Sequence, residues 1–182
     1  MNLPEVRESL RAIQRAATAI AEEADRALSA LENTDPANPS RWLCYPLHIE
    51  TKRINSPFGV ERATFTHEGI DFYAPLGTPV LASADGVVSR TYEGRFYGKC
   101  VVITHPHGGK TYTTYSAHLD RWSVAAGQRV RQGETIGASG NTGNSTGPHF
   151  HMTLVEVGNP KRLRGISLVG CIDPMPLIMN PP

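Results

Sequence analysis

Apolar residues in the first 32 positions recur at alternating spacings of three and four. They are Leu3, Val6, Leu10, Ile13, Ala17, Ile20, Ala24, Ala27 and Leu31. This heptad spacing, with no glycine in the segment and Pro4 near its start, predicts one long amphipathic helix over residues 1–32. Two interpretations of the apolar stripe are open: a coiled coil that joins two chains into a homodimer, or a helix that lies on the domain that follows.

The pattern changes after this segment. Residues 33–40 combine two prolines with small polar residues, which predicts a linker. Short runs rich in β-branched and aromatic residues then follow, separated by glycine and proline turns, at 70–73, 79–82, 86–90, 100–104, 111–115, 128–136 and 150–157. Such runs are typical of an antiparallel sheet, so residues 41–182 are predicted to form one mainly β domain, with a Pro-rich tail at 158–182.

Composition narrows the functional classes. The 182 residues include 18 Lys and Arg against 17 Asp and Glu, and the net charge of +1 argues against a dedicated nucleic-acid binder. No apolar run is long enough to predict a membrane span. The N-terminus also lacks the uninterrupted apolar stretch of a signal peptide. We therefore expect either a protein made in the cytoplasm or an exported protein that lacks its leader here. The three cysteines form no C-x-x-C pair, so buried thiols are expected and a cysteine zinc site is not.

Histidines supply the candidate chemistry. His149 and His151 are alternate residues of a predicted strand, so their side chains project from one face. Two imidazoles in this arrangement suit zinc, or one metal ligand and one catalytic base. His67 and Asp71 flank Gly69 in a turn that leads into another predicted strand, and they offer an imidazole and a carboxylate.

Other titratable residues give weaker signals. His118 lies at the end of a predicted strand and is unremarkable without its context. Glu68 is not expected to act as a zincin-type base, because the spacing differs from H-E-x-x-H and the glycines around it disfavour a helix. His105 and His107 form a second H-x-H pair, but the proline and glycines beside them predict an exposed hairpin turn. His48 is expected in packing or at the surface.

Together these pieces resemble the lysostaphin-like (LytM-type) zinc endopeptidases of bacterial cell walls, over roughly residues 53–157. The matching motifs, in order, are Ile54-Asn-Ser-Pro-Phe-Gly59, His67-x-Gly-Ile-Asp71-Phe, Ala74-Pro-x-Gly-Thr-Pro-Val80, Ala84-x-Gly-x-Val88, Val130-x-x-Gly133 and Gly140-Asn-Thr-Gly-x-Ser-Thr-Gly-Pro-His149-x-His151. One departure is visible. The family often has Tyr two residues before the catalytic His, whereas this chain has Ser116 there and Tyr115 one residue further back.

The resemblance implies that His67, Asp71 and His151 bind one zinc ion per chain. It implies that His118 and His149 are catalytic histidines that do not bind the metal. The implied fold is a compact antiparallel β-sheet peptidase domain with a groove, and the implied substrates are stem or bridge peptides of peptidoglycan. Zinc in such a site lowers the pKa of a bound water toward about 7, and the unligated histidines would move its proton.

Several alternatives stay open at this point. A non-catalytic LytM-type binding module that activates another cell-wall hydrolase is opposed by the presence of all five site residues. A biotinyl- or lipoyl-type carrier is opposed by the lack of a lysine near 137–143. The scissile bond is either Gly-Gly or a D-alanyl cross-link to diaminopimelate. A phage or prophage endolysin is favoured modestly over an exported autolysin, because the N-terminal segment does not resemble a leader.

Overall fold

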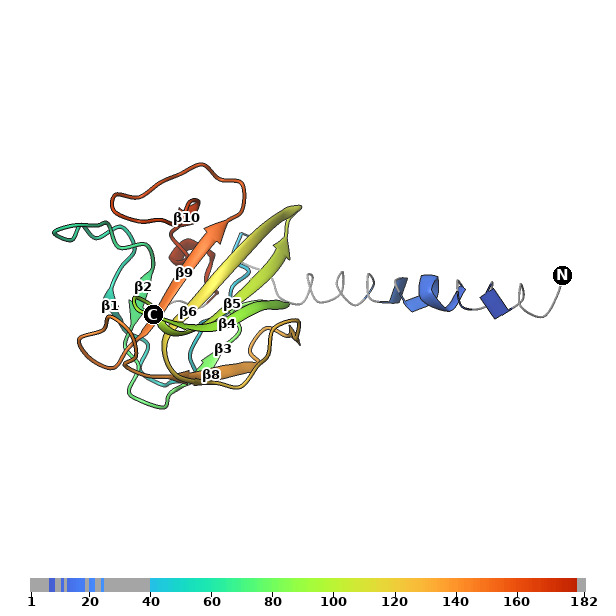
Figure 1. Cartoon of the computed structure of the whole chain (residues 1–182), viewed down its shortest axis with the longest axis horizontal. Helices are drawn as coiled ribbons and strands as arrows, with labels where there is room; N and C mark the ends of the chain where they lie inside the picture. Colours follow the sequence, from blue (N-terminus) through green and yellow to red (C-terminus); the bar gives the residue numbers. More distant parts are fainter. Residues whose placement is uncertain are drawn as a thin grey trace. The chain divides into compact units, whose positions relative to one another are not determined.

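The computed structural model describes residues 7–8, 11, 13–18, 20–21, 24 and 40–179, and the chain divides into two units, Met1–Thr34 and Asp35–Pro182. In the first unit the described residues have helical backbone (Figure 1). The elements that the structure delimits include no long helix, only the short 3-10 helix η1 (Met175–Leu177). One helix across residues 1–32 is therefore not supported. Most of that range, and the predicted linker up to residue 39, lies outside the described residues.

The physical reason lies in the apolar stripe of that segment. A helix gains most of its stability when an apolar face is packed. The side chains of Ile13 and Ile20 are instead 64% and 70% exposed. For these two residues, the pattern supplies the helical period without the burial that stabilises a helix.

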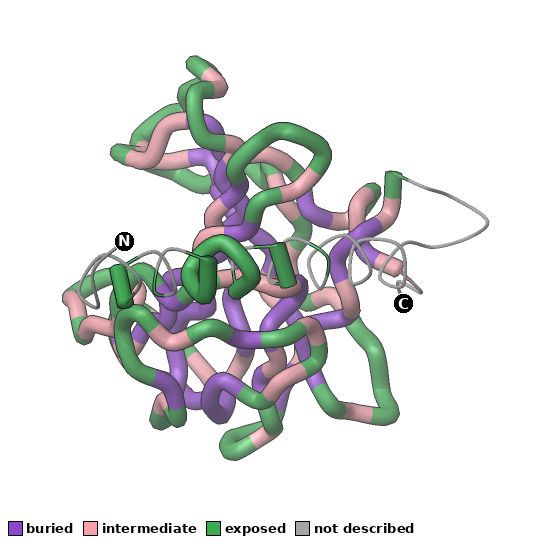
Figure 2. Tube along the Cα trace, turned by 90° about the vertical axis from the view of Figure 1, so that its right-hand side faces the viewer, coloured by how far each residue is buried: buried purple, intermediate pink, exposed green. Residues whose placement is uncertain are grey.

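The second unit is a mainly β, antiparallel structure, as predicted. Its strands are β1 (Ile54–Ser56), β2 (Ile70–Phe72), β3 (Pro79–Leu81), β4 (Gly86–Gly94), β5 (Gly98–His107), β6 (Lys110–Trp122), β7 (Arg129–Val130), β8 (Thr135–Ser139), β9 (Phe150–Glu156) and β10 (Cys171–Ile172). The main sheet has the order β1-β2-β9-β6-β5-β4-β7, while β10 pairs with β9, and β8 pairs with both β3 and β6 (Figure 1). Figure 2 shows buried stretches through the middle of the trace, while many of the outer loops are exposed.

Strand β6 is longer than the sequence pattern predicts. Its first half pairs with β9 up to Ala117, and its second half pairs with β8 from Leu119 onward. Both faces of the sheet are covered here, with Leu119 in the main core and Ala117 in a second buried cluster, so four successive residues from Ser116 to Leu119 are buried and the alternation that marks a half-exposed strand disappears. The predicted hairpin between 100–104 and 111–115 is confirmed as β5 and β6.

Alternate residues of the strands divide the interior. Phe150, Met152 and Leu154 of β9 belong to the main hydrophobic core, whereas His151 and Thr153 project from the opposite face of the sheet. That opposite face carries a smaller buried cluster, which includes Ala117 directly across from His151. The sheet therefore has a face dominated by the main hydrophobic core and an opposite face that carries His151 and Thr153 beside the smaller cluster.

The C-terminal region packs against the start of this unit. Strand β10 adds to β9, and the backbone N–H of Met179 donates to the carbonyl of Leu43 at 2.7 Å.

All three cysteines are free thiols, with Cys100 and Cys171 buried and Cys44 half-buried. Within the residues that the structure describes, no helix has the length and apolar character needed to cross a membrane.

His105 and His107 do not form the exposed turn that the sequence predicts. Trp42, from a segment far away in sequence, covers the hairpin and stacks on His107 with ring centroids 4.3 Å apart. His105 is fully buried, where Nδ1 donates to the carbonyl of Asp85 at 2.9 Å and Nε2 lies 2.8 Å from Thr114 Oγ1. His48 is exposed, in agreement with the prediction.

His105 makes folding stability sensitive to acid. Burial lowers the pKa of its imidazole from 6.5 to about 4, so between these values the unfolded chain binds a proton that the folded chain does not. The free energy of unfolding should fall as pH decreases through this window, by about 1.4 kcal/mol per pH unit for this group. Urea unfolding from pH 7.5 to 4.5, with chelator present, measures this dependence.

The matched variant is His105→Gln, which removes the titrating group. Its absolute stability should be lower, because the Trp42 packing and both hydrogen bonds are disturbed. Its stability should nevertheless change less steeply with pH than that of the wild type. Equal slopes for the two proteins would contradict the assignment of this acid sensitivity to His105.

Candidate metal centre

Antiparallel pairing brings two of the predicted residues together. Asp71 of β2 lies directly opposite His151 of β9 in the sheet register. Ile70 and Phe72, on either side of Asp71, enter the main core, so the carboxylate points to the other face, where His151 lies. His67 precedes β2 by three residues and reaches the same point from the loop.

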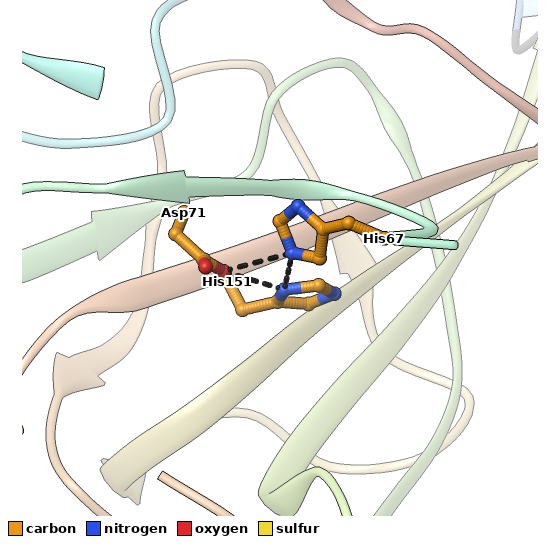
Figure 3. A group of neighbouring side chains, drawn as sticks. All are labelled: His67, Asp71 and His151. Carbon is orange, nitrogen blue, oxygen red and sulfur yellow. Dashed lines mark hydrogen bonds and ion pairs between the residues drawn. The ribbon is translucent and has the colours of Figure 1, made fainter. Parts of the chain in front are cut away.

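The three side chains converge through one potential ligand atom each (Figure 3). Asp71 Oδ1 lies 2.8 Å from His151 Nδ1 and 3.2 Å from His67 Nε2, and the two nitrogens are 3.2 Å apart. Ligand atoms of a tetrahedral zinc site, at bond lengths near 2.0–2.1 Å, are separated by roughly 3.3 Å. The spacing and the N, N, O donor set therefore fit zinc. The three residues are the ones that the family resemblance implies as ligands.

Hydrogen bonds on the far side of each ring orient the ligand nitrogens. His67 Nδ1 donates to the carbonyl of Pro57 at 2.8 Å, which leaves the lone pair on Nε2. His151 Nε2 lies 2.8 Å from Thr153 Oγ1, and donation to that hydroxyl leaves the lone pair on Nδ1. Two lone pairs and a carboxylate that face one another repel unless a cation lies between them. The tautomers thus favour a metal ion.

The pKa shifts reflect the same attraction for positive charge. Burial acts to lower the pKa of His67, but the hydrogen bond and charge of Asp71 outweigh it and raise that pKa above its ordinary value. Burial acts to raise the pKa of Asp71, but its contacts with His151 and His67 outweigh burial and hold the carboxyl pKa well below its usual range. Asp71 is therefore ionised at neutral pH.

Two further histidines face this cluster. The rings of His118 and His149 are 4.7 Å apart, and His149 Nε2 is 3.6 Å from Asp71 Oδ1. His118 Nδ1 donates to the carbonyl of Thr142 and His149 Nδ1 to that of Gly147, both at 2.8 Å. In its neutral form, each ring therefore presents an unprotonated Nε2. Burial lowers the pKa of His118 to about 4, which keeps it neutral at pH 7.

The backbone at His118 is strained. His118 has φ +56°, the only positive value for a non-glycine residue in the described part of the chain. It lies where β6 exchanges β9 for β8 and where the register with β5 is irregular. Its N–H donates to the carbonyl of Tyr97 at 2.8 Å, which stabilises this conformation. A costly backbone geometry at this position indicates a functional constraint.

Sequence reasoning missed the residues that support the site. Thr153 shares the face of His151 two positions along the strand, so alternation could have identified it. Glu68, a turn residue by its sequence, is buried and accepts a hydrogen bond from the Tyr97 hydroxyl at 2.7 Å. It lies 4.0 Å from His151 Nε2, on the side of the ring away from Asp71. No local pattern predicts the long-range contact between Tyr97 and Glu68.

The family model for peptidase family M23 matches residues 65–162, more than half of the chain. That range contains strands β2 to β9, together with the proposed ligands and catalytic histidines His67, Asp71, His118, His149 and His151. The chain therefore belongs to peptidase family M23, a metallopeptidase family, in agreement with the resemblance seen in its motifs.

Curated relatives share this region. The peptidoglycan DD-endopeptidase ShyA of Vibrio cholerae is 46% identical over 114 residues, which cover 63% of this chain and 24% of that protein. The DD-carboxypeptidase/endopeptidase Mpg of Neisseria meningitidis is 48% identical over 115 residues, covering 59% of this chain and 25% of that protein. The chain thus spans about a quarter of the length of these relatives.

Solved structures share the fold. The catalytic domain of the antimicrobial peptidase lysostaphin from Staphylococcus simulans matches with a TM-score of 0.58 and 27% identity, covering 69% of this chain and 90% of that one. A zinc-containing peptidase from Vibrio cholerae matches with a TM-score of 0.57 and 32% identity, covering 63% of this chain and 36% of that one. The antiparallel architecture is therefore common to this chain and these peptidases.

Close packing at Gly69 offers a test of the metal centre. A Cβ at this position would lie 2.4 Å from the carbonyl oxygen of Met152 and 2.7 Å from His151 Nε2. We expect Gly69→Ala to displace the His151 ring and to weaken zinc binding at least tenfold, measured by competition with a chromophoric chelator. Gly147→Ala is the matched control, because a Cβ there meets nothing within 4 Å. Equal zinc affinity in both variants would show that this close approach does not position His151.

Proposed function

We propose that this chain is a zinc-dependent endopeptidase that hydrolyses peptide cross-links of bacterial peptidoglycan. His67, Asp71 and His151 would hold one zinc ion, and His118 and His149 would act as catalytic histidines that do not bind the metal. The observation that carries the proposal is the convergence of two imidazole nitrogens and one carboxylate oxygen at a spacing that fits zinc, beside two further imidazoles whose Nδ1 atoms donate to backbone carbonyls. Family membership and the names of the curated relatives support peptidoglycan as the substrate.

Zinc, when bound, supplies Lewis-acid chemistry: it lowers the pKa of a water molecule and polarises the scissile carbonyl. Hydrolysis forms a bond between the water oxygen and the carbonyl carbon, breaks the C–N bond and transfers a proton to the leaving nitrogen. His118 is kept neutral by burial and its Nε2 can accept the proton of the water. His149 Nε2, close to Asp71, can hold or return a proton on the other side of the site.

The remaining structure supports this division of roles. The carbonyls of Thr142 and Gly147 keep the Nδ1 proton of each catalytic ring in place, so each Nε2 stays available for proton transfer. No serine or cysteine nucleophile is needed for direct attack by water. The site of action would be the cell wall. Phage-type release, bacteriolytic activity and a homodimer through residues 1–32 stay predictions.

Digestion of purified peptidoglycan tests the proposed function. Walls with glycine bridges and walls with direct cross-links would be treated, and released fragments identified by mass spectrometry. We expect new peptide termini that disappear with chelator and return with added zinc. A fully zinc-loaded protein that cleaves neither wall would refute the proposal and favour a non-catalytic binding module.

Two histidine variants separate metal binding from proton transfer. His151→Ala removes a ligand, so both bound zinc and activity should be lost. His149→Ala removes an unligated ring, so zinc should be retained while kcat falls by about 10²–10⁴. Metal content by mass spectrometry and kcat on a cross-linked peptide measure the two effects. Retention of stoichiometric zinc by His151→Ala would overturn the ligand assignment.

A further inference from the structure

An arginine lies at the rim of the candidate metal centre. Arg62 Nη2 donates to Ser56 Oγ at 2.8 Å and is 3.5 Å from Asp71 Oδ2. The two oxygens of Asp71 therefore have different surroundings, because Oδ1 contacts both imidazoles and Oδ2 faces the guanidinium. The Arg62 side chain is 40% exposed, against 15% for Asp71. A cation thus lies directly beside the reaction site and is open to solvent.

The loop that carries Arg62 is held from a distant part of the chain. Arg164 pairs with Glu61 Oε2 through Nη2 at 2.5 Å and donates to the carbonyl of Arg62 at 2.8 Å. The carbonyl of Arg164 in turn accepts the N–H of Thr66 at 2.8 Å. These contacts fix the backbone on both sides of Arg62, so its side chain projects from a defined position.

The same contacts determine which carboxylates are available to pair with Arg62. Glu61 is the adjacent carboxylate, and it is occupied by Arg164 and by the Thr66 hydroxyl at 2.8 Å. A guanidinium has five N–H donors. In the described part of the chain, Ser56 Oγ is the acceptor within hydrogen-bond distance of Arg62, and Asp71 lies further away. Arg62 therefore retains donors that can bind a second carboxylate.

We propose that Arg62 binds a substrate carboxylate on the carbon that bears the scissile nitrogen, so that this enzyme selects direct cross-links over glycine bridges. The inference rests on the proposed function. In a D-alanyl cross-link to diaminopimelate, the carbon attached to the scissile nitrogen carries a free carboxylate. In an internal Gly-Gly bond, that carbon carries no charged side group. A planar guanidinium can form two parallel hydrogen bonds with a carboxylate. Such a contact both strengthens binding and fixes the orientation of the bound substrate.

A different role for Arg62 must be separated from this one. Through Asp71 Oδ2 it could simply orient a metal ligand, and its loss would then lower zinc affinity and slow every substrate equally. A carboxylate-binding residue instead affects one class of substrate and leaves zinc affinity nearly unchanged. Zinc affinity and substrate preference together distinguish the two roles.

The experiment uses two synthetic cross-linked peptides that differ only in this group, free carboxylate in one and carboxamide in the other. For the zinc-loaded chain of residues 1–182, we expect kcat/KM to be roughly 10- to 100-fold higher for the carboxylate peptide, the range of a charge-assisted hydrogen bond. Arg62→Gln should abolish most of this preference, mainly through KM. Arg62→Lys should restore part of it.

Arg53→Gln is the matched control, because Arg53 stacks on the Tyr73 ring and, within the described part of the chain, forms no hydrogen bond or ion pair with the metal-centre residues. It should keep the wild-type preference. No preference in the wild type, or an equal loss on both peptides together with weaker zinc binding in Arg62→Gln, would overturn the inference. If the wild type cleaves neither peptide, the proposed function fails. Calorimetric titration of both peptides into wild type and Arg62→Gln then decides the role of Arg62 separately.

Discussion

The register between β2 and β9 is the constraint on which the site depends. It places Asp71 opposite His151, with apolar neighbours of both residues in the main core. A slip of one residue would turn Ile70 or Phe72 toward the histidines and place the carboxylate in the apolar core. The burial of Phe72 and Phe150 therefore does more than stabilise the sheet. Because burying the aromatic rings requires this register, the hydrophobic energy of the core also fixes the geometry of the ligand cluster.

Backbone carbonyls determine the protonation pattern of the site. Pro57, Thr142 and Gly147 each accept an imidazole N–H, and a carbonyl, unlike a hydroxyl, cannot reverse this role. Three of the four imidazoles thus have their tautomers set by loop conformation, and only His151 relies on a side chain, Thr153. This explains why the loops before β2 and β9 are rich in residues that suit turns. These loops must position the carbonyl groups that accept the imidazole N–H groups. The positive φ of His118 is likewise an unfavourable backbone conformation that the geometry of the site requires.

The sequence predicts much of the site because its signals are local. Alternation places His149 and His151 on one side, and the short turn places His67 near Asp71. His118 is different, because its position depends on β6 changing partners, which is a property of long-range pairing. The same limit explains the wrong interpretation of His105. Its hairpin turn was identified correctly, but Trp42 covers that hairpin from a segment about 60 residues earlier. Periodicity also failed where β6 is buried on both faces.

In the proposed function, catalytic chemistry and substrate selectivity would depend on different parts of the sequence. The family model begins at residue 65 and ends at residue 162, and it includes every proposed ligand and catalytic histidine. Glu61, Arg62 and Arg164 lie just outside this range, on either side. Their contacts join the two flanks of the matched region across the rim of the metal centre. The guanidinium of Arg62 would attract a negatively charged group of a substrate bound beside Asp71. It would leave in place the imidazoles of His118 and His149, which would move protons. Under this proposal, substrate choice would vary through the flanking loop while the zinc chemistry stays the same.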